Sequence, residues 1–438
     1  MTGCGCQFST QTTGPVWHPD DKAIPTPTRP NGEKDIYRPD ILEHIEATIK
    51  ELDGELRELS LDIHSHPELK YEERYAHDAL TAFMTKHGFE VTKHYHLETA
   101  WLATFAHGEG GRTIGVNSEM DALPGVGHAC GHNLIAISGV GVAIAIQKAL
   151  MKFNIAGKVA LLGTPAEEGG SGKIILLEKG AYKEMSACLM CHPAPGPVGS
   201  VSLTSCLALE RITVEYFGHT AHAALSPWEG KNALDAAVLG YNNISALRQQ
   251  LLPTHRVHGI FEGKDWAPNI IPDYAKMICY VRAPTRAELQ VTLKRVLPCF
   301  EAAGLATGCE VKINQEETGT HDLRQNLALG GEVANIITAK YGAIDYEYGI
   351  KSASTDFGNV TYALPSLHPG FAIPTIKDGG NHTPGFTKSA ATMQAHYACL
   401  DITKALAATG MRVLIDDEFL AKVKKTFEED SEVQSLLK

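Results

Sequence analysis

Short apolar strands that alternate with helices constrain this chain more than any other feature. The runs at 113–117, 158–162 and 188–191 have the length and composition of buried strands, and an apolar segment of helical length, 134–153, connects the first two. A connection of this kind joins parallel strands, and parallel sheets are covered by helices on both faces. The sequence therefore predicts an α/β domain with a mainly parallel sheet.

Potential metal ligands lie just after these predicted strands. Asp121 and Cys130 follow the first strand. Glu167 and Glu168 follow the second, and His192 follows the third. Open α/β sheets bind their ligands at the carboxyl ends of the strands. We therefore expect three loops from separate parts of the chain to converge on one site.

The turn at 127–133 has the composition of a metal-binding turn. Cys130 and His132 lie two residues apart between glycines, and a thiolate and an imidazole so placed can bind one divalent ion. The adjacent Glu167 and Glu168 add one more ligand and a proton acceptor. Taken alone, a cysteine such as Cys130 is more often an ordinary buried thiol, and an acidic pair such as Glu167 and Glu168 is more often solvated. Their combination favours a metal site with its own general base.

A second domain is expected from residue 206. Its predicted elements follow the order strand-helix-strand-strand-helix-strand, which is typical of a small antiparallel sheet with two helices on one face. The first pattern then resumes. We predict a flexible leader at 1–38, a metallohydrolase catalytic domain at 39–205 and 321–438, and an inserted ferredoxin-like α+β lid or dimerisation domain at 206–320.

Composition argues against two classes of partner. The net charge is −12 and no basic run occurs, so nucleic-acid binding is not expected. No uninterrupted apolar stretch has the roughly 18 residues of a membrane span, and the start of the chain lacks an apolar signal core. Ten cysteines, mostly in apolar runs, fit a reducing compartment. We expect a cytoplasmic protein without a membrane partner, and we assign Cys4 and Cys6 to the disordered leader.

Six motifs occur in the order seen in a known enzyme family: GHACGHN, TPAEEGG, FGHTAHAA, APNIIPD, STDFGNVTYALPSLHP and GNHTPGF. Over residues 40–410 the chain resembles the zinc-dependent aminoacylase and carboxypeptidase family of amidohydrolases. It is most similar to the branch with a Cys-Gly-His metal motif. That branch contains auxin-conjugate amidohydrolases, p-aminobenzoyl-glutamate hydrolases and dipeptidase-like proteins.

The resemblance implies two divalent metal ions per subunit, with one ligand shared between them. Cys130 would be the shared ligand. A thiolate favours zinc, and manganese and cobalt are the alternatives. The five implied ligands are Cys130, His132, Glu168, His192 and His382.

Other roles at the metal site also come from the resemblance. Glu167 would take a proton from the attacking water and return it to the departing amine. Adjacent residues of an extended segment point in opposite directions, so Glu167 is available if Glu168 binds metal. Asp121 would orient a ligand imidazole by accepting its second N–H. Glu119 and Asn133 depart from the family pattern, and Glu119 is either a ligand or a hydrogen-bond acceptor.

Three residues of the second domain are expected to act on the substrate. By the resemblance, His222 reaches the active site of the partner subunit in a homodimer and stabilises the oxyanion of the tetrahedral intermediate. Asn269 is the candidate for binding the amide or carboxylate of the substrate. Arg282 would balance the carboxylate, and a structural role for it is equally open.

These features predict a binuclear metal-dependent amidohydrolase that cleaves the amide bond of N-acyl amino acids or dipeptides. One alternative is a catalytically silent relative that serves as a dimeric binding or scaffold protein. Such a protein should have lost Glu167 or a metal ligand, because unpaired acidic ligands repel one another, and all are present here. A condensing N-acyl amino acid synthase would use the same site.

Overall fold

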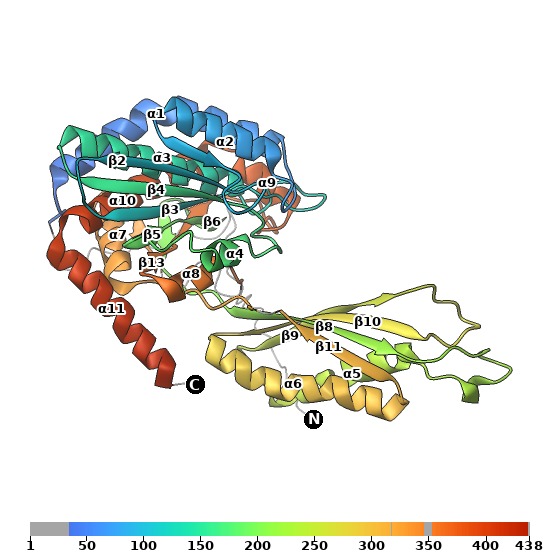
Figure 1. Ribbon diagram of the computed structural model, residues 1–438. Coiled ribbons are helices and arrows are strands. Elements are labelled where there is room, and N and C mark those ends of the chain that lie inside the picture. The colour runs from blue at the N-terminus through green and yellow to red at the C-terminus, as the bar shows by residue number, and fades with distance from the viewer. Residues whose placement is uncertain (1–34, 317, 346–352, 437–438) are drawn as a thin grey trace, which may run out of the picture.

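Three β-sheets and the helices around them make up the protein (Figure 1). The computed structural model describes residues 35–316, 318–345 and 353–436. Residues 1–34 of the predicted leader, including Cys4 and Cys6, lie outside the described residues.

The largest sheet has six strands in the order β1-β2-β4-β3-β5-β13. The pairs β3/β4, β3/β5 and β5/β13 are parallel, whereas β1, β2 and β4 pair antiparallel. The sheet is therefore mainly parallel, as predicted. Its strands are β1 (Glu90–Lys93), β2 (Trp101–His107), β3 (Thr113–Glu119), β4 (Gly157–Thr164), β5 (Ala187–Leu189) and β13 (Ser366–Leu367).

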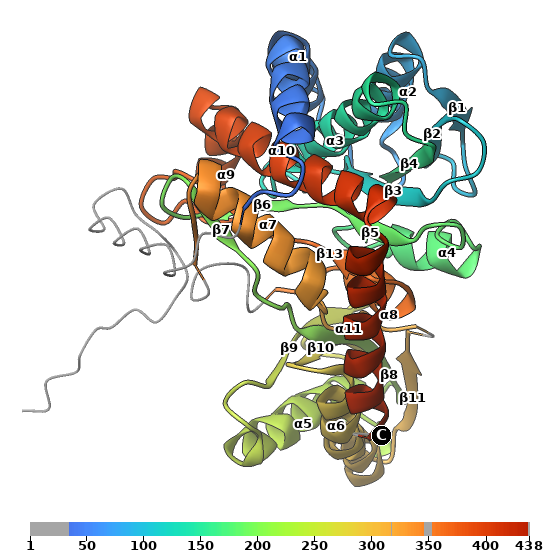
Figure 2. The same cartoon turned by 90° about the vertical axis from the view of Figure 1, so that its left-hand side faces the viewer.

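Apolar clusters cover both faces of this sheet. Successive side chains of β4 alternate between them, since Leu161 belongs to one cluster and Leu162 to the other. Helices α1, α3 and α10 pack against one another around the first cluster (Figure 2), and α4 and α8 contribute to the second. These helices are α1 (Pro39–Ser65), α3 (His132–Lys152), α4 (Gly172–Glu178), α8 (Phe357–Ala363) and α10 (Met393–Ile415).

Helix α3 is a long apolar helix of the core. It is long and apolar enough to cross a membrane by length and composition alone, but 89% of its apolar window is buried inside the protein. It packs against α1, α10, β3 and β4. Its composition therefore follows from its central place in the fold.

The second sheet is fully antiparallel, in the order β11-β8-β10-β9. Helices α5 and α6 pack against each other and against this sheet, and together they enclose a separate apolar core. The element order and the sheet confirm the predicted ferredoxin-like unit. Its elements are β8 (Ala208–Phe217), α5 (Ala233–Leu247), β9 (Arg256–Gly263), β10 (Tyr274–Ala283), α6 (Arg286–Thr307) and β11 (Glu310–Gln315). The exact domain boundaries stay predictions.

A third sheet was not predicted. It has four short strands in the order β12-β7-β14-β6, and β6 begins at His192. Its strands are β6 (His192–Pro195), β7 (Ser200–Ser202), β12 (Ala343–Ile344) and β14 (Gly370–Ile373). The remaining helices are α2 (Arg74–Lys86), α7 (Leu327–Lys340), α9 (Pro384–Ala390), α11 (Asp417–Leu436) and the short 3₁₀ turns η1 (Pro227–Glu229) and η2 (Arg248–Gln250).

Candidate metal centre and active site

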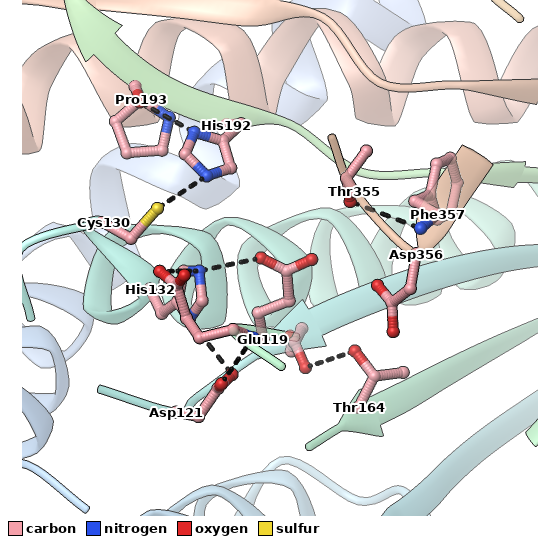
Figure 3. A network of polar contacts seen from close by, with 12 residues as sticks. Glu119, Asp121, Cys130, His132, Thr164, His192, Pro193, Thr355, Asp356 and Phe357 are labelled. Carbon is pink, nitrogen blue, oxygen red and sulfur yellow. Dashed lines mark hydrogen bonds and ion pairs between the residues drawn. The ribbon is translucent and has the colours of Figure 1, made fainter. Parts of the chain in front are cut away.

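Cys130 and His132 lie at the start of α3, where the chain turns sharply into the helix. Gly131 between them has φ +80°, and a Cβ atom there would lie 2.6 Å from Cγ of Pro193. Glycine is therefore required by both the backbone angle and the lack of space. The turn presents both side chains on the same side as His192, and the Cys130 Sγ lies 3.3 Å from Nε2 of His192 (Figure 3).

The imidazole of His132 lies between two buried carboxylates. Its Nδ1 is 3.2 Å from Oδ1 of Asp121, and its Nε2 is 3.3 Å from Oε2 of Glu119 (Figure 3). Asp121 also accepts the backbone N–H of Glu168 through Oδ2 at 2.9 Å. The Asp121 carboxylate thus contacts the imidazole of His132 and the backbone of Glu168, both of them candidate ligands. This geometry is expected of a group that orients metal ligands.

Glu168 and His382 complete the cluster. The Glu168 Oε1 lies 3.5 Å from Nε2 of His382 and 3.9 Å from Nε2 of His132. The backbone N–H of His382 donates to the carbonyl of Ala129 at 2.8 Å, which fixes its loop beside the cysteine turn. All five predicted ligands are therefore brought together from four segments.

Two groups of potential ligands share the thiol of Cys130. One contains Cys130, His132 and His192, and the other contains Cys130, Glu168 and His382; within each group the ligand atoms lie within 4.8 Å of one another. Among the residues that the structure describes, Nε2 of His132 and Oε1 of Glu168 are buried with no hydrogen-bond partner. Buried polar atoms of this kind need a partner, and thiolate, imidazole and carboxylate are the donors that a divalent metal prefers. The residues therefore fit a metal centre.

The surroundings of these ligands set their protonation. Burial lowers the pKa of His192 to about 4, so the ring is neutral and able to bind metal. Burial opposes ionisation of Glu168, but the contact with Nε2 of His382 and the charge of His132 outweigh it and lower its pKa to about 2. For Cys130, burial and the Glu168 charge raise the thiol pKa well above its usual value. Metal binding at the cysteine must therefore displace a proton.

Glu167 lies between the ligand cluster and a second group of carboxylates. In one direction its carboxylate lies within 4.8 Å of Glu168 and of a ring nitrogen of His132, and in the other it lies within 4.8 Å of Glu119 and Asp356. Burial and the charges of Glu119 and Glu168 raise its pKa well above the usual range. A carboxylate whose proton affinity is raised is suited to accept a proton during a reaction.

Lys173 and Asp356 were not identified from the sequence. The buried Nζ of Lys173 is 2.7 Å from Oε1 of Glu119 and 2.7 Å from Oδ1 of Asp356. Burial disfavours the Glu119 charge, but Lys173 and His132 outweigh it and lower its pKa to about 2. Glu119 is thus an ion-pair acceptor with one oxygen directed at His132. Asp356 lies within the motif STDFGNVTYALPSLHP, but a single acidic residue in a sequence does not indicate that it pairs with a buried lysine.

Asn133 has a structural explanation. Its amide donates to Oγ of Ser60 at 2.9 Å and to the carbonyl of Ala390 at 3.2 Å. These bonds connect α3 to α1 and α9. Its side chain therefore contributes to helix packing.

A cavity of about 490 Å³ opens onto the ligand cluster. Its lining includes Cys130, Glu167 and His192 of the ligand cluster, Arg211 and Arg282 of the second sheet, and Glu316, which directly follows β11. The guanidinium of Arg282 donates to Oγ of Ser354 at 2.8 Å, which also lines the cavity. The structure thus brings Arg282 to the candidate site.

His222 and Asn269 lie beside each other but not in this cavity. The carbonyl of Asn269 accepts the backbone N–H of Ala223 at 3.0 Å, and His222 forms a β-bridge with Ile270. Nδ1 of His222 accepts the backbone N–H groups of Ala224 and Leu225 at 3.2 and 3.1 Å. The chain therefore does not bring these two residues to its own ligand cluster.

Comparisons with known proteins identify the sequence relatives of this chain. The profile of peptidase family M20/M25/M40 matches residues 115–409. Xaa-Arg dipeptidase of Mus musculus is 42% identical over 403 residues, covering 89% of this chain and 92% of the relative. A p-aminobenzoyl-glutamate hydrolase chain of Escherichia coli is 28% identical over 451 residues, covering 85% and 92%.

A solved structure has a similar fold. A dinuclear metal-binding peptidase of the M20 family from Bacillus subtilis superposes with a TM-score of 0.66 at 20% identity, covering 83% of this chain and 99% of that chain. The sequence matches confirm the family resemblance inferred from the six motifs, and the superposition confirms the predicted fold.

Proposed function

Because the chain belongs to peptidase family M20/M25/M40 and is thus a metal-dependent amidohydrolase, we propose that it hydrolyses dipeptides, with N-acyl amino acids as the neighbouring substrate class. One observation carries this proposal. A thiol, three imidazoles and two adjacent carboxylates meet at a cavity that also contains Arg282. Hydrolysis of an amide needs an activated water, a proton acceptor and a group that positions the substrate, and this set supplies each.

We propose that Cys130, His132, Glu168, His192 and His382 hold two divalent ions, with Cys130 shared. The two ligand groups that share its sulfur support this assignment. Bound there, divalent ions would polarise the substrate carbonyl and lower the pKa of a water molecule. The thiolate and the imidazoles favour zinc over manganese or cobalt.

The residues around the ions would perform the remaining steps. Glu167 accepts the proton of the attacking water and then donates it to the departing amine. Asp121 holds His132 through Nδ1, which leaves Nε2 as its ligand atom. Lys173 keeps Glu119 ionised, so the negative charge beside His132 is retained when the site is empty or filled.

Substrate recognition would use the walls of the cavity formed by the second sheet. Arg282 is placed to bind the free carboxylate of the C-terminal residue, since a guanidinium pairs with a carboxylate through two parallel hydrogen bonds. The relative named Xaa-Arg dipeptidase supports a C-terminal arginine in the substrate. Glu316, on the same wall, offers a carboxylate to a basic side chain.

Assembly and location are also part of the proposal. We propose a homodimer formed through the second domain, in which His222 and Asn269 act on the substrate held by the partner. β9 is an edge strand, and it exposes Ile260 and Phe261, as expected of a surface that pairs with another chain. The eight cysteines in the described ranges are free, which supports a cytoplasmic location.

The test is release of free amine from a substrate panel. Ala-Arg, Ala-Lys, Ala-Leu and N-acetyl-arginine are incubated with the protein plus zinc or manganese, and a chelator is added to matched samples. We expect chelator-sensitive hydrolysis that is fastest for the dipeptides with basic C-terminal residues. Preference for N-acetyl-arginine would favour an aminoacylase. Metal binding without turnover on any substrate would favour the silent scaffold, and amide formation from amine and acid would favour the synthase.

A further inference from the structure

The backbone of Ala166, directly before Glu167, adopts an unusual conformation. Its φ is +60°, in the left-handed region that costs an alanine about 1–2 kcal/mol. The side chain is fully buried, so solvent does not relieve the strain. A non-glycine residue keeps such a conformation only where its surroundings determine it. The contacts of Ala166 therefore decide where the following carboxylates point.

The side chain of Glu73 provides the main polar contact. Its Oε1 accepts the backbone N–H of Ala166 at 2.8 Å, and its Oε2 accepts the hydroxyl of Thr99 at 2.7 Å. Glu73 is completely buried. It directly precedes α2, so its own position is fixed by the first turn of that helix.

Glu73 occupies an unfavourable place for a carboxylate. In the parts of the chain that the structure describes, no ion pair involves it, and the nearby charge of Asp121 has the same sign. Burial, above all, raises its pKa, and repulsion from Asp121 adds to the rise. Burying a carboxyl group without an opposite charge disfavours the folded state. The hydrogen bonds from Thr99 and from the backbone N–H groups of Glu73 and Ala166 act in the opposite direction and favour the ionised carboxylate.

The residues around Glu73 contact the same loop at other points. The hydroxyl of Tyr71 donates to the carbonyl of Gly170, and Nζ of Lys70 donates to the carbonyl of Gly169 at 2.9 Å. The carbonyl of Glu68 accepts the N–H of Ala122, next to Asp121, at 2.7 Å. The segment 68–73 thus holds the loop 165–171 at its start and near its end.

We propose that Glu73 is a positioning residue for Glu167: by accepting the N–H of Ala166, it holds the loop in the conformation that directs Glu167 to the water and Glu168 to the metal. This inference rests on the proposed hydrolytic function. It assigns Glu73 no contact with substrate or metal. What matters is a hydrogen-bond acceptor at this position, not its charge.

Three variants of Glu73 separate the position of its hydrogen-bond acceptor from its charge. Glu73→Gln keeps an acceptor at the same distance and can also donate to the Thr99 hydroxyl. Glu73→Asp keeps the charge but withdraws the acceptor by one methylene, and Glu73→Leu removes it. Thr99→Val is the matched control, because it removes the other hydrogen bond of the same carboxylate and leaves Ala166 bonded.

We expect Glu73→Gln and Thr99→Val to keep kcat within about threefold of the wild type, and Glu73→Asp and Glu73→Leu to lower kcat by roughly ten- to a hundredfold with little change in KM. Hydrogen-deuterium exchange of the peptide spanning 164–172 should increase in Glu73→Asp and Glu73→Leu but not in Glu73→Gln or Thr99→Val. Bound metal, measured by mass spectrometry of the elements, should stay within the wild-type range in the Gln and Thr99→Val proteins. If the Leu variant does not fold, the Gln and Asp variants carry the comparison.

The opposite order, with Asp active and Gln inactive, would overturn the proposal, because charge would then be the property required. Unchanged exchange in the Asp and Leu variants would overturn it as well. The exchange measurement needs no substrate. A wild-type protein that hydrolyses nothing on the panel, yet shows the expected pattern of exchange, would contradict the proposed function and leave the loop contact supported.

Discussion

At the scale of residues, two adjacent glutamates differ because their neighbours differ. Glu168 faces imidazoles, which lower its pKa to about 2 despite burial. The pKa of Glu167 is raised by burial and by the carboxylates of Glu119 and Glu168. One residue is thus suited to bind a cation and the other to exchange a proton. The sequence predicts one ligand and one proton acceptor for this pair, and both roles stay proposals.

Replacing Glu167 by glutamine should remove the proton acceptor and leave the ligands intact. We expect kcat to fall by on the order of a hundredfold or more, the usual contribution of a general base, while metal content stays at the wild-type level. Glu168→Gln is the matched comparison and should lower metal content. Initial rates and elemental analysis of both variants check this. Wild-type turnover by Glu167→Gln would remove Glu167 from the mechanism.

Replacing Cys130 by serine should affect both ions, because its sulfur belongs to both ligand groups. We expect the loss of most bound metal from both positions. His192→Ala removes a ligand from one group only and should lower the metal-to-protein ratio by about one ion. The ratio, measured after dialysis against metal-free buffer, distinguishes these cases. Equal losses in both variants would contradict a shared thiolate.

Metal affinity should depend on pH through the same cysteine. The raised pKa means that the thiol is protonated in the metal-free protein at neutral pH, so binding releases a proton and becomes weaker as the pH falls. Titration calorimetry in two buffers of different ionisation enthalpy measures the protons released. Cys130→Ser should release fewer. The same number of protons from both proteins would argue against a thiolate ligand.

At the scale of elements, the buried ion pairs of Lys173 connect α4, the end of β3 and the start of α8. Lys173→Met would leave Glu119 and Asp356 buried without a cation, which typically destabilises the folded state by about 3–5 kcal/mol. Urea unfolding checks this. Lys425→Met is the control: Lys425 pairs with Glu429 on the surface of α11 at 3.6 Å, and such a pair contributes less than about 1 kcal/mol. Equal effects would show that Lys173 does not offset the buried charges of Glu119 and Asp356.

The elements also show what could be predicted from sequence. The strands β3 and β4 were predicted from short apolar runs and the helix α3 from a long apolar segment, and the ends of these elements located Cys130 and Glu168. The third sheet was missed because strands of two to four residues, such as β12 and β14, are defined by tertiary pairing. Lys173 and Glu73 were missed because an isolated charged residue is usually solvated, and their partners Asp356 and Ala166 are far along the chain.

At the scale of the whole molecule, the cavity depends on both sheets. The candidate ligands come from loops beside the mainly parallel sheet and from β6 of the third sheet, whereas Arg282 belongs to the antiparallel sheet and Glu316 directly follows it. A change in the angle between the two units would therefore alter substrate binding without moving the ligands. His222 does not line this cavity, which is why its proposed role requires a second subunit.

Mixing two inactive variants tests that role. In a dimer of His222→Ala with Glu167→Gln, one site combines an intact Glu167 with an intact His222 from the partner, and the other site lacks both. Random exchange should therefore restore about a quarter of the wild-type activity, because half of the dimers are mixed and each has one complete site. If His222 acted within its own chain, no site in any mixture would be complete. Activity is followed as subunits exchange after mixing, with sedimentation to establish the dimer and each variant alone as control. A mixture that stays inactive while the subunits exchange would exclude a contribution of His222 across the interface.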